Sequence, residues 1–237
     1  MQTDVSIIIT NYNRDKYIGR CIRSCLSQSF RDRYEIIVVD DASTDNSREV
    51  IESFSFIKPI FLDKNVGVAE ASNIGIKKAI GQLIIRVDSD DYINTNTLLF
   101  MAELLLSNQD IGFVYPDYFL VDEQGVKIER KNIDTLKDLY THGAGVMFRK
   151  INLEAIGLYD PTLKHSDDYD LLIRYLKNFD GYHLRMPLYR YRQHENNITK
   201  QTEERNHFRR VVEKKNNLKE MKLWLASVKL GTIGTEI

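Results

Sequence analysis

The sequence predicts an α/β fold in which helices cover both faces of a mostly parallel sheet. Runs at residues 5–9, 36–39 and 83–87 are continuously apolar and rich in β-branched side chains, as in strands buried on both faces. Between these runs, apolar residues recur at helical spacing, for example through residues 17–26. Strands that alternate with helices in this way are typical of a parallel sheet.

Each element of the first half has its own local signal. The strand at residues 5–9 precedes a helix over residues 17–26, and the strand at residues 36–39 precedes a helix that Asp45 or Asn46 could cap. We expect a third strand at residues 60–62. The helix after it, over residues 68–80, should end at Gly81 as a C-cap, before the fourth strand at residues 83–87.

The second half is less regular. We expect a helix over residues 97–106, followed by apolar runs at residues 111–115 and 146–148. A helical stripe over residues 171–179 begins beside the acidic pair at residues 167–168.

Length and composition exclude several classes of protein. The 237 residues, of which 43 % are hydrophobic, fit one α/β domain with an ample core. The 33 basic residues nearly cancel the 34 acidic ones, so charge gives no support for a nucleic-acid partner. No second cysteine pair joins Cys21 and Cys25 to complete a zinc site, and we predict that both are buried thiols.

No segment predicts a membrane span or a secretory signal. The sequence lacks a long apolar run, and its first residues lack the basic and apolar regions of a signal peptide. We therefore expect a cytoplasmic protein. Residues 202–229 are rich in Lys and Arg and contain Trp224, which predicts a solvated helix packed on the domain. The alternative is a peripheral contact between this basic tail and the inner face of a membrane.

Three acidic clusters, far apart in the sequence, carry the functional argument. Residues 40–41 and 88–91 each follow a strand directly, and residues 167–168 open a helical stripe. In open parallel sheets, ligands bind beyond the carboxyl ends of the strands, so the first two clusters should share an edge. Concentrated negative charge is costly unless a cation is bound there. The sequence therefore indicates a divalent cation that carries a phosphorylated substrate.

The spacing of Asp88 and Asp90 suits a metal ion, because alternate side chains of an extended segment point to the same side. Ligand sets made only of oxygen favour Mg²⁺ or Mn²⁺. Asp41 could accept hydrogen bonds from a base or ribose. Turns and helix capping remain the structural alternatives for all three clusters. The glycine-rich loops of dinucleotide dehydrogenases and of P-loop enzymes are absent.

The order and spacing of several motifs resemble those of family 2 glycosyltransferases. The motifs are VSIIITNYN at residues 5–13, VVDDASTD at 38–45, NVG at 65–67, SNIG at 72–75, VDSDD at 87–91, GLYD at 157–160 and DDYDL at 167–171. The match runs over residues 5–199, more than four-fifths of the chain.

This resemblance implies a GT-A fold, Rossmann-like, and transfer from a nucleotide-diphosphate sugar with inversion at the anomeric carbon. It implies one domain over residues 1–200, with a nucleotide-sugar half (1–92) and an acceptor half (93–200), and a helical tail over residues 201–237. The expected partners are this donor and a glycan or lipid-linked acceptor, with UDP as the first guess for the nucleotide.

The resemblance also implies roles for individual residues. Asp168 matches the general base, and Asp90 with His194 would bind Mn²⁺ or Mg²⁺ on the diphosphate. The donor would contact a larger set, in which Tyr12 stacks near the base: Thr10, Tyr12, Asn13, Asp41, Asn65, Gly67, Asn73, Asp88 and Ser89.

These roles are chemically coherent. A single in-line displacement needs no nucleophile from the enzyme, and a carboxylate that accepts the proton of the acceptor hydroxyl contributes typically ~10²–10⁴-fold. The departing diphosphate gains negative charge, which a metal and a nearby cation would stabilise.

The sequence departs from the family pattern in three places, one of which is the acidic pair Asp167-Asp168, where Glu-Asp is usual. Ser72 stands where an arginine is common, so a diphosphate contact is missing or is supplied by Arg14, Arg86 or Lys77. The Gln-x-x-Arg-Trp motif of processive polysaccharide synthases is absent, which favours addition of one sugar per encounter.

Two other functions are weighed against this one. A metal-dependent nucleotidyltransferase would need a Gly- and Arg/Lys-rich first loop, whereas residues 10–14 contain one Arg and no Gly. A catalytically silent nucleotide-sugar-binding module would not need to retain both Asp90 and Asp168.

Overall fold

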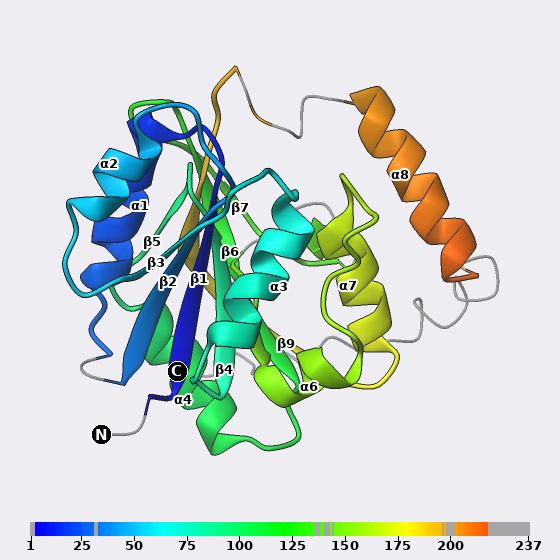
Figure 1. Cartoon of the computed structure of the whole chain (residues 1–237). Coiled ribbons are helices and arrows are strands. Elements are labelled where there is room, and N and C mark those ends of the chain that lie inside the picture. The colour runs from blue at the N-terminus through cyan, green and yellow to red at the C-terminus, as the bar shows by residue number, and fades with distance from the viewer. Residues whose placement is uncertain are drawn as a thin grey trace.

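Nine strands form one sheet in the computed structural model, which describes residues 3–30, 33–135, 138–139, 143, 145–195, 197 and 202–217 (Figure 1). The strands are β1 (Val5–Asn11), β2 (Tyr34–Asp40), β3 (Lys58–Phe61), β4 (Leu83–Asp88), β5 (Tyr92–Ile93), β6 (Phe113–Val121), β7 (Lys127–Lys131), β8 (Met147–Arg149) and β9 (Gly181–Arg192). Their order is β3-β2-β1-β4-β8-β6-β9-β5, and β7 pairs with β6.

The first half of the sheet is parallel, as the sequence predicts. β1 lies between β2 and β4, and β3 lies beyond β2, all in parallel pairing. The register places Asn11 opposite Asp40 and Thr10 opposite Asp88. The ends of β1, β2 and β4 therefore meet at one edge, which confirms the expectation that the first two acidic clusters share a rim.

The second half of the sheet is mixed. The short strand β8 is antiparallel to both β4 and β6, whereas β9 runs parallel to β6 and antiparallel to β5. The apolar runs at residues 111–115 and 146–148 become β6 and β8. Between these two runs, at residues 127–131, lies β7, which forms a hairpin with β6.

Helices cover both faces of the sheet. α1 (Asp15–Leu26), α2 (Ser47–Glu52) and α4 (Thr97–Ser107) pack on one face, and α3 (Val68–Lys78), α6 (Lys150–Ala155) and α7 (Asp167–Leu176) pack on the other. Side chains of β1 alternate between these faces: Ile7 and Ile9 join the α1 side, and Ile8 joins the α3 side. Cys21 and Cys25 are buried free thiols on α1, as predicted.

Gly81 does not cap α3, contrary to the expectation. The helix ends at Lys78, and Ala79 is already extended. The N–H of Gly81 instead donates to Ser6 Oγ at 2.9 Å, and a Cβ at position 81 would lie 2.6 Å from the Ser6 backbone nitrogen. The glycine is required because the chain passes close to β1, not because a helix ends there.

The last described helix, α8 (Thr202–Lys215), packs on α7 (Figure 1). Phe208 and Val212 contact an apolar cluster that includes Tyr169 and Ile173 of α7. This packing agrees with the favoured interpretation of the basic tail. The rest of that tail, residues 218–237 with Trp224, lies outside the described residues. Within the part of the chain that the structure describes, no helix is both long enough and apolar enough to cross a bilayer.

Candidate active site

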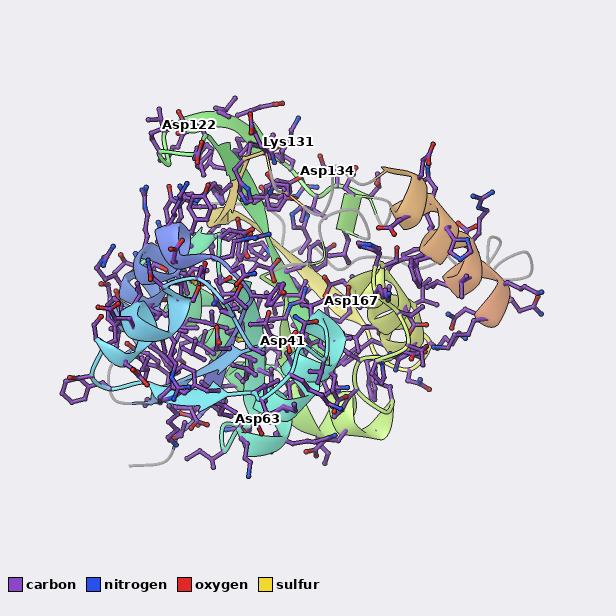
Figure 2. The ribbon with its side chains drawn as sticks, turned by 45° about the horizontal axis from the view of Figure 1, so that its top comes forward. Asp41, Asp63, Asp122, Lys131, Asp134 and Asp167 are labelled. Carbon is purple, nitrogen blue, oxygen red and sulfur yellow. The ribbon has the colours of Figure 1, made fainter. Side chains whose placement is uncertain are left out.

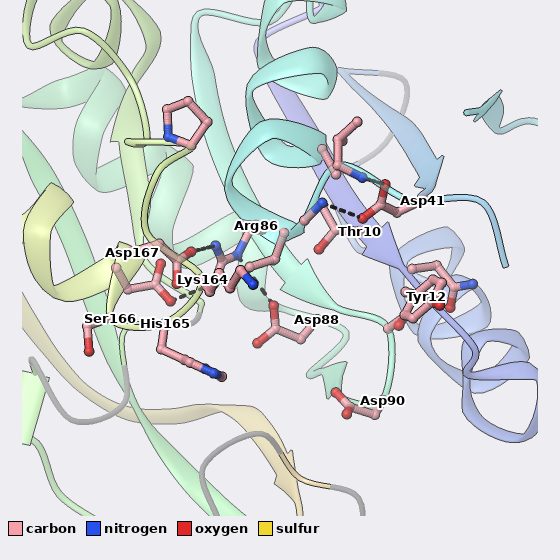
Figure 3. A pocket seen from close by; sticks show the side chains of 18 of the residues that line it. Thr10, Tyr12, Asp41, Arg86, Asp88, Asp90, Lys164, His165, Ser166 and Asp167 are labelled. Carbon is pink, nitrogen blue, oxygen red and sulfur yellow. Dashed lines mark hydrogen bonds and ion pairs between the residues drawn. The ribbon is translucent and has the colours of Figure 1, made fainter. Parts of the chain in front are cut away.

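A pocket of about 990 Å³ lies at the edge where the strand ends meet (Figure 3). Most of the predicted site residues line it: Thr10, Tyr12, Asp41, Asn65, Gly67, Asp88, Ser89, Asp90 and Asp168. Asp41 and Asp167 lie near the middle of the molecule in Figure 2, far from Asp122 and Lys131 on the β6–β7 hairpin. All three acidic clusters of the sequence therefore reach a single pocket.

Asp41 is held by the backbone on one side of this pocket. Its Oδ1 accepts from the N–H of Val66 at 2.7 Å and its Oδ2 accepts from the N–H of Gly67 at 2.8 Å. Gly67 has φ +87° and precedes α3, a conformation that suits glycine. These bonds orient the carboxylate, and its remaining lone pairs can accept from a ligand.

Asp90 lies further along the same rim and is in contact with His194. His194 Nε2 lies 2.9 Å from Asp90 Oδ2, and Arg14 Nε lies 3.2 Å from the same oxygen. Burial opposes ionisation of Asp90, but the hydrogen bond from His194 and the charge of Arg14 lower its pKa overall. His194 itself is buried behind Asp90, with its ring stacked on Tyr17.

Arg86 of β4 joins three carboxylates at the centre of the pocket (Figure 3). Its Nη1 lies 3.0 Å from Asp167 Oδ2, its Nη2 lies 2.5 Å from Asp168 Oδ2, and its Nε lies 3.3 Å from Asp88 Oδ1. We call these four residues the Arg86 cluster. Burial opposes the charge of the guanidinium, but Asp168 and its neighbours raise the pKa of Arg86, so this cation stays charged.

Asp168 opens α7 and faces the pocket with 21 % of its side chain exposed. Burial, together with the negative charges of Asp167 and Asp88, raises its pKa to about 7, against the opposing effect of Arg86. The hydroxyl of Tyr159 donates to Asp168 Oδ1 at 3.3 Å. A carboxylate with a pKa near neutrality suits a general base.

The wall beside Asp168 comes from the loop that precedes α7 and from α8. Lys164 and His165 of the loop line the pocket, and so do Asn206 and Arg209 of α8. The guanidinium of Arg209 lies over the ring of Tyr169, at 5.0 Å from its centroid. The helical tail therefore forms part of the pocket, which the sequence did not indicate.

Three predicted residues do not line the pocket. Asn13 accepts the backbone N–H of Thr44 at 2.8 Å and so holds the loop after β1 to the loop after β2. Asn73 of α3 donates to the carbonyl of Tyr159 at 2.9 Å and accepts its N–H at 3.0 Å. His194 does not line the pocket itself but bonds to Asp90 and Asn197, which do. In this structure Asn13 and Asn73 fix the backbone that supports the site.

The structure also locates the three residues that could replace the arginine expected at Ser72. Ser72 is buried and bonds to the carbonyl of Val68, so it contributes nothing to the pocket. Lys77 does not line the pocket, and the guanidinium of Arg86 is engaged by three carboxylates. Of the three substitutes, Arg14 lines the pocket beside Asp90, with which it forms an ion pair.

Sequence reasoning missed the Arg86 cluster and the role of Tyr159. The signal for Arg86 was its spacing from Asp88, since residues two apart on a strand face the same side. Ile84, two residues earlier, packs on the face that α7 covers. The same alternation therefore directs Arg86 toward the acidic start of that helix.

The residues present fit a divalent cation that binds together with a diphosphate. Within the described residues, no group of three or more His, Cys, Asp or Glu side chains is arranged to hold a metal by itself. Asp88 and Asp90 line the pocket two residues apart, and no hydrogen bond among the described residues occupies Asp90 Oδ1. Mg²⁺ commonly binds through one or two carboxylates, with phosphate oxygens and water as the other ligands.

The sequence matches a known family and several known proteins. The model of the family Glycosyl transferase family 2 matches residues 6–157. An uncharacterized glycosyltransferase of Haemophilus influenzae is 35 % identical over 172 residues, which cover 69 % of this chain and 68 % of that protein. Another, from Rickettsia typhi, is 31 % identical over 188 residues, which cover 73 % of this chain and 58 % of that protein.

Solved structures share the fold. TarS 1–349 of S. aureus in complex with UDP-GlcNAc has a TM-score of 0.76 at 24 % identity, covering 89 % of this chain and 65 % of that one. Mannosyltransferase PcManGT from Pyrobaculum calidifontis, in complex with GDP-Man and Mn²⁺, has a TM-score of 0.65 at 18 % identity, covering 83 % and 59 %. These likenesses confirm the predicted GT-A fold. This chain thus spans about two-thirds or less of those two chains.

Proposed function

The chain belongs to glycosyltransferase family 2, and from this premise we propose that it moves a sugar from a nucleotide-diphosphate sugar to a hydroxyl group by one inverting displacement. The observation that carries this proposal is the meeting of Asp41, Asp90 and Asp168 in one pocket. Two of these carboxylates would serve the donor, and the third would serve the acceptor.

The donor would bind along the ends of β1, β2 and β4. Asp41, fixed by two backbone N–H groups, would accept hydrogen bonds from the nucleoside, and the half-exposed ring of Tyr12 would stack near the base. UDP is the first candidate because TarS binds UDP-GlcNAc, and GDP is the second because PcManGT binds GDP-Man.

Asp90 would hold the divalent cation, with His194 behind it and Arg14 beside it. When bound, Mn²⁺ or Mg²⁺ would neutralise the charge that develops on the departing diphosphate. Arg14 supplies a fixed positive charge at the same place, where the charge of the leaving group grows.

Asp168 would accept the proton of the acceptor hydroxyl as the new glycosidic bond forms. Its pKa of about 7 leaves it basic enough to take the proton and largely deprotonated above neutrality. The acceptor, which we propose to be a glycan or a lipid-linked sugar, would enter beside the loop before α7 and beside α8. The basic tail would then lie on the acceptor side, where contact with the inner face of a membrane would bring a lipid-linked acceptor near Asp168.

A thermal-shift panel tests the donor assignment. We expect UDP- or GDP-sugars to raise the Tm more with Mn²⁺ than without it, because a ligand that binds only the folded state stabilises it. Asp90→Asn should remove most of the Mn²⁺-dependent part of the shift. Asp63→Asn, in an exposed loop, should leave the whole shift intact.

Transfer and binding together separate this function from its rivals. A protein that binds nucleotide sugars but never releases nucleoside diphosphate from them, in water or with sugar acceptors, would be a silent binding module. If no nucleoside diphosphate or nucleotide sugar raises the Tm, the proposed function is wrong.

A further inference from the structure

Arg86 is a buried cation that the proposed reaction does not use. Only 8 % of its side chain is exposed, and it stands on β4 between the donor side and the acceptor side of the pocket. Its guanidinium contacts Asp88 at the end of its own strand, and Asp167 and Asp168 at the start of α7. Burying a cation among carboxylates is costly unless the geometry is good, so this arrangement needs an explanation.

We propose that Arg86 is a positioning residue that fixes the carboxylate of Asp168 for proton transfer and links it to the donor side through Asp88. This inference rests on the proposed function, because it concerns the residue assigned there as the base. Arg86 acts on the reaction only through Asp168, and we assign it no contact with the reacting atoms.

Arg86 and Tyr159 together orient the carboxylate of Asp168. Asp168 Oδ2 is held by Arg86 Nη2 at 2.5 Å, and Asp168 Oδ1 accepts from the Tyr159 hydroxyl at 3.3 Å. Tyr159 is itself fixed, because both its backbone N–H and its carbonyl bond to the side chain of Asn73. With one partner on each oxygen, the carboxylate cannot rotate freely, and it keeps lone pairs for a proton.

Arg86 also counters the negative charge around Asp168. The titratable and charged groups around Asp168 are Arg86 and Asp88 from β4, Asp167 from α7, and Tyr159, Lys164 and His165 from the loop before α7. Burial and the two neighbouring carboxylates favour the protonated form of Asp168, whereas Arg86 favours the ionised form. Without this guanidinium, the pKa of Asp168 would lie higher still, and a larger fraction of the base would be protonated at neutral pH.

Arg86 also connects Asp168 to Asp88. Arg86 Nε makes an ion pair with Asp88 but no hydrogen bond to any described residue. Asp88 lines the donor side of the pocket, so a ligand bound there would act on Asp168 through one guanidinium. Arg86 is thus a direct physical link between Asp88 and Asp168.

The test uses the full chain with Arg86→Met, which removes the charge, and Arg86→Lys, which keeps the charge but loses the forked geometry. Arg174→Lys is the matched control: Arg174 is also largely buried and binds Asp170 and the carbonyls of Ile156 and Leu158, away from Asp168. The ¹³C resonance of the Asp168 carboxyl, assigned by its loss in Asp168→Asn, is followed against pH without any ligand.

We expect the titration midpoint of Asp168 to rise by about one pH unit or more in Arg86→Met, and by less in Arg86→Lys. The control should leave it unchanged. The activity of Arg86→Met is measured with the nucleotide sugar that gives the largest thermal shift. Its kcat should fall at least ~10-fold with little change in donor KM. The acidic limb of its pH–rate profile should move to higher pH.

If Arg86→Met does not fold, Arg86→Lys and Tyr159→Phe provide the same readouts on a milder change. An unmoved midpoint together with an unmoved pH–rate profile in the folded Arg86 variants would overturn the inference. That result would leave the proposed function untouched. Wild-type transfer by Asp168→Asn would instead remove the proposed base, and with it the premise of this inference.

Discussion

The two sides of the pocket that we assign to the donor (Asp41) and to the acceptor (Asp168) hold their carboxylates in different ways. On the donor side, both oxygens of Asp41 accept backbone N–H groups, from Val66 and Gly67. On the acceptor side, Asp168 is held by two side chains, those of Arg86 and Tyr159. Hydrogen bonds from backbone N–H groups remain when the side chains of those residues are substituted. Hydrogen bonds from side chains are lost when one of those residues is substituted. The acceptor side should therefore be the more fragile one.

The largest effect should come from Asp168→Asn. An amide cannot accept the proton, so we expect kcat to fall by ~10²–10⁴-fold while donor binding in a thermal-shift assay stays as in the wild type. Asp167→Asn is the matched comparison, since Asp167 is also bound by Arg86, whereas the Tyr159 hydroxyl donates to Asp168. It should lose much less activity. Equal losses in the two variants would contradict the assignment of Asp168 as the base.

Gly143→Ala should have a smaller effect. The added methyl group would push against the side chain of Asp168 from the backbone at residue 143. Gly143 has φ +65°, and a Cβ there would lie 2.5 Å from the Cβ of Asp168. Gly157→Ala is the control, because Gly157 has φ +87° but nothing within 4 Å of a Cβ. Both variants should lose about 1 kcal/mol of stability through backbone strain.

Only Gly143→Ala should also lose activity, by about tenfold or more, because a displacement of the base near 1 Å is enough for such a loss. Initial rates and urea denaturation of both variants give the comparison. If the two variants lose activity equally, backbone strain alone accounts for the effect and the clash with Asp168 is irrelevant.

The pH dependence should show the same base. Because the pKa of Asp168 is about 7, kcat/KM should fall about tenfold for each pH unit below that value and level off above it. The free energy of unfolding should change in the opposite direction with pH. The folded state holds this proton up to about pH 7, and the unfolded chain releases it near pH 4, so this contribution to stability is lost as pH rises between these values.

Rates and denaturation midpoints measured from pH 5 to pH 8 check both signs. In Asp168→Asn, the change of stability with pH that comes from the Asp168 carboxyl should disappear. A rate profile that is flat between pH 5 and pH 7 would show that no group with this pKa controls the reaction.

The smallest effect should come from loosening α8. Lys215 Nζ lies 2.6 Å from Asp160 Oδ2 and 2.9 Å from Asp170 Oδ1, and it anchors the helix that carries Asn206 and Arg209. Because 40 % of the Lys215 side chain is exposed, Lys215→Met should lower stability by about 0.5–1 kcal/mol only. Lys214→Met, one residue earlier and exposed, should leave the Tm unchanged. Identical Tm values in both variants would show that this anchor contributes nothing.

The donor side could largely be predicted from the sequence, because its signals are local. The continuous apolar runs of β1, β2 and β4 end directly at the residues that line the pocket, and parallel strands bring those ends to one edge. Each apolar run that predicts a strand lies within a few residues of the pocket residues that follow it in the sequence. For this reason the fold class and the shared rim of the first two acidic clusters were predictable.

The acceptor side could not be predicted to the same depth, because it depends on contacts between distant segments. Arg86 meets Asp168 only because α7 packs on the face of the sheet to which Arg86 points. The three-residue strand β8, inserted between β4 and β6, has too short a pattern to fix its pairing. A motif also does not show whether a residue lines the pocket or holds the backbone around it. Asn73 stands in a family motif, yet its side chain binds the backbone of Tyr159.

The most direct test of the separate roles of Asp41, Asp90 and Asp168 is a crystal structure with a nucleoside diphosphate and Mn²⁺. We predict that the nucleoside lies against Asp41, that the ion binds Asp90, and that Asp168 stays on Arg86 with no metal contact. An ion bound by Asp167 and Asp168, or a nucleotide placed beside α8, would contradict the account.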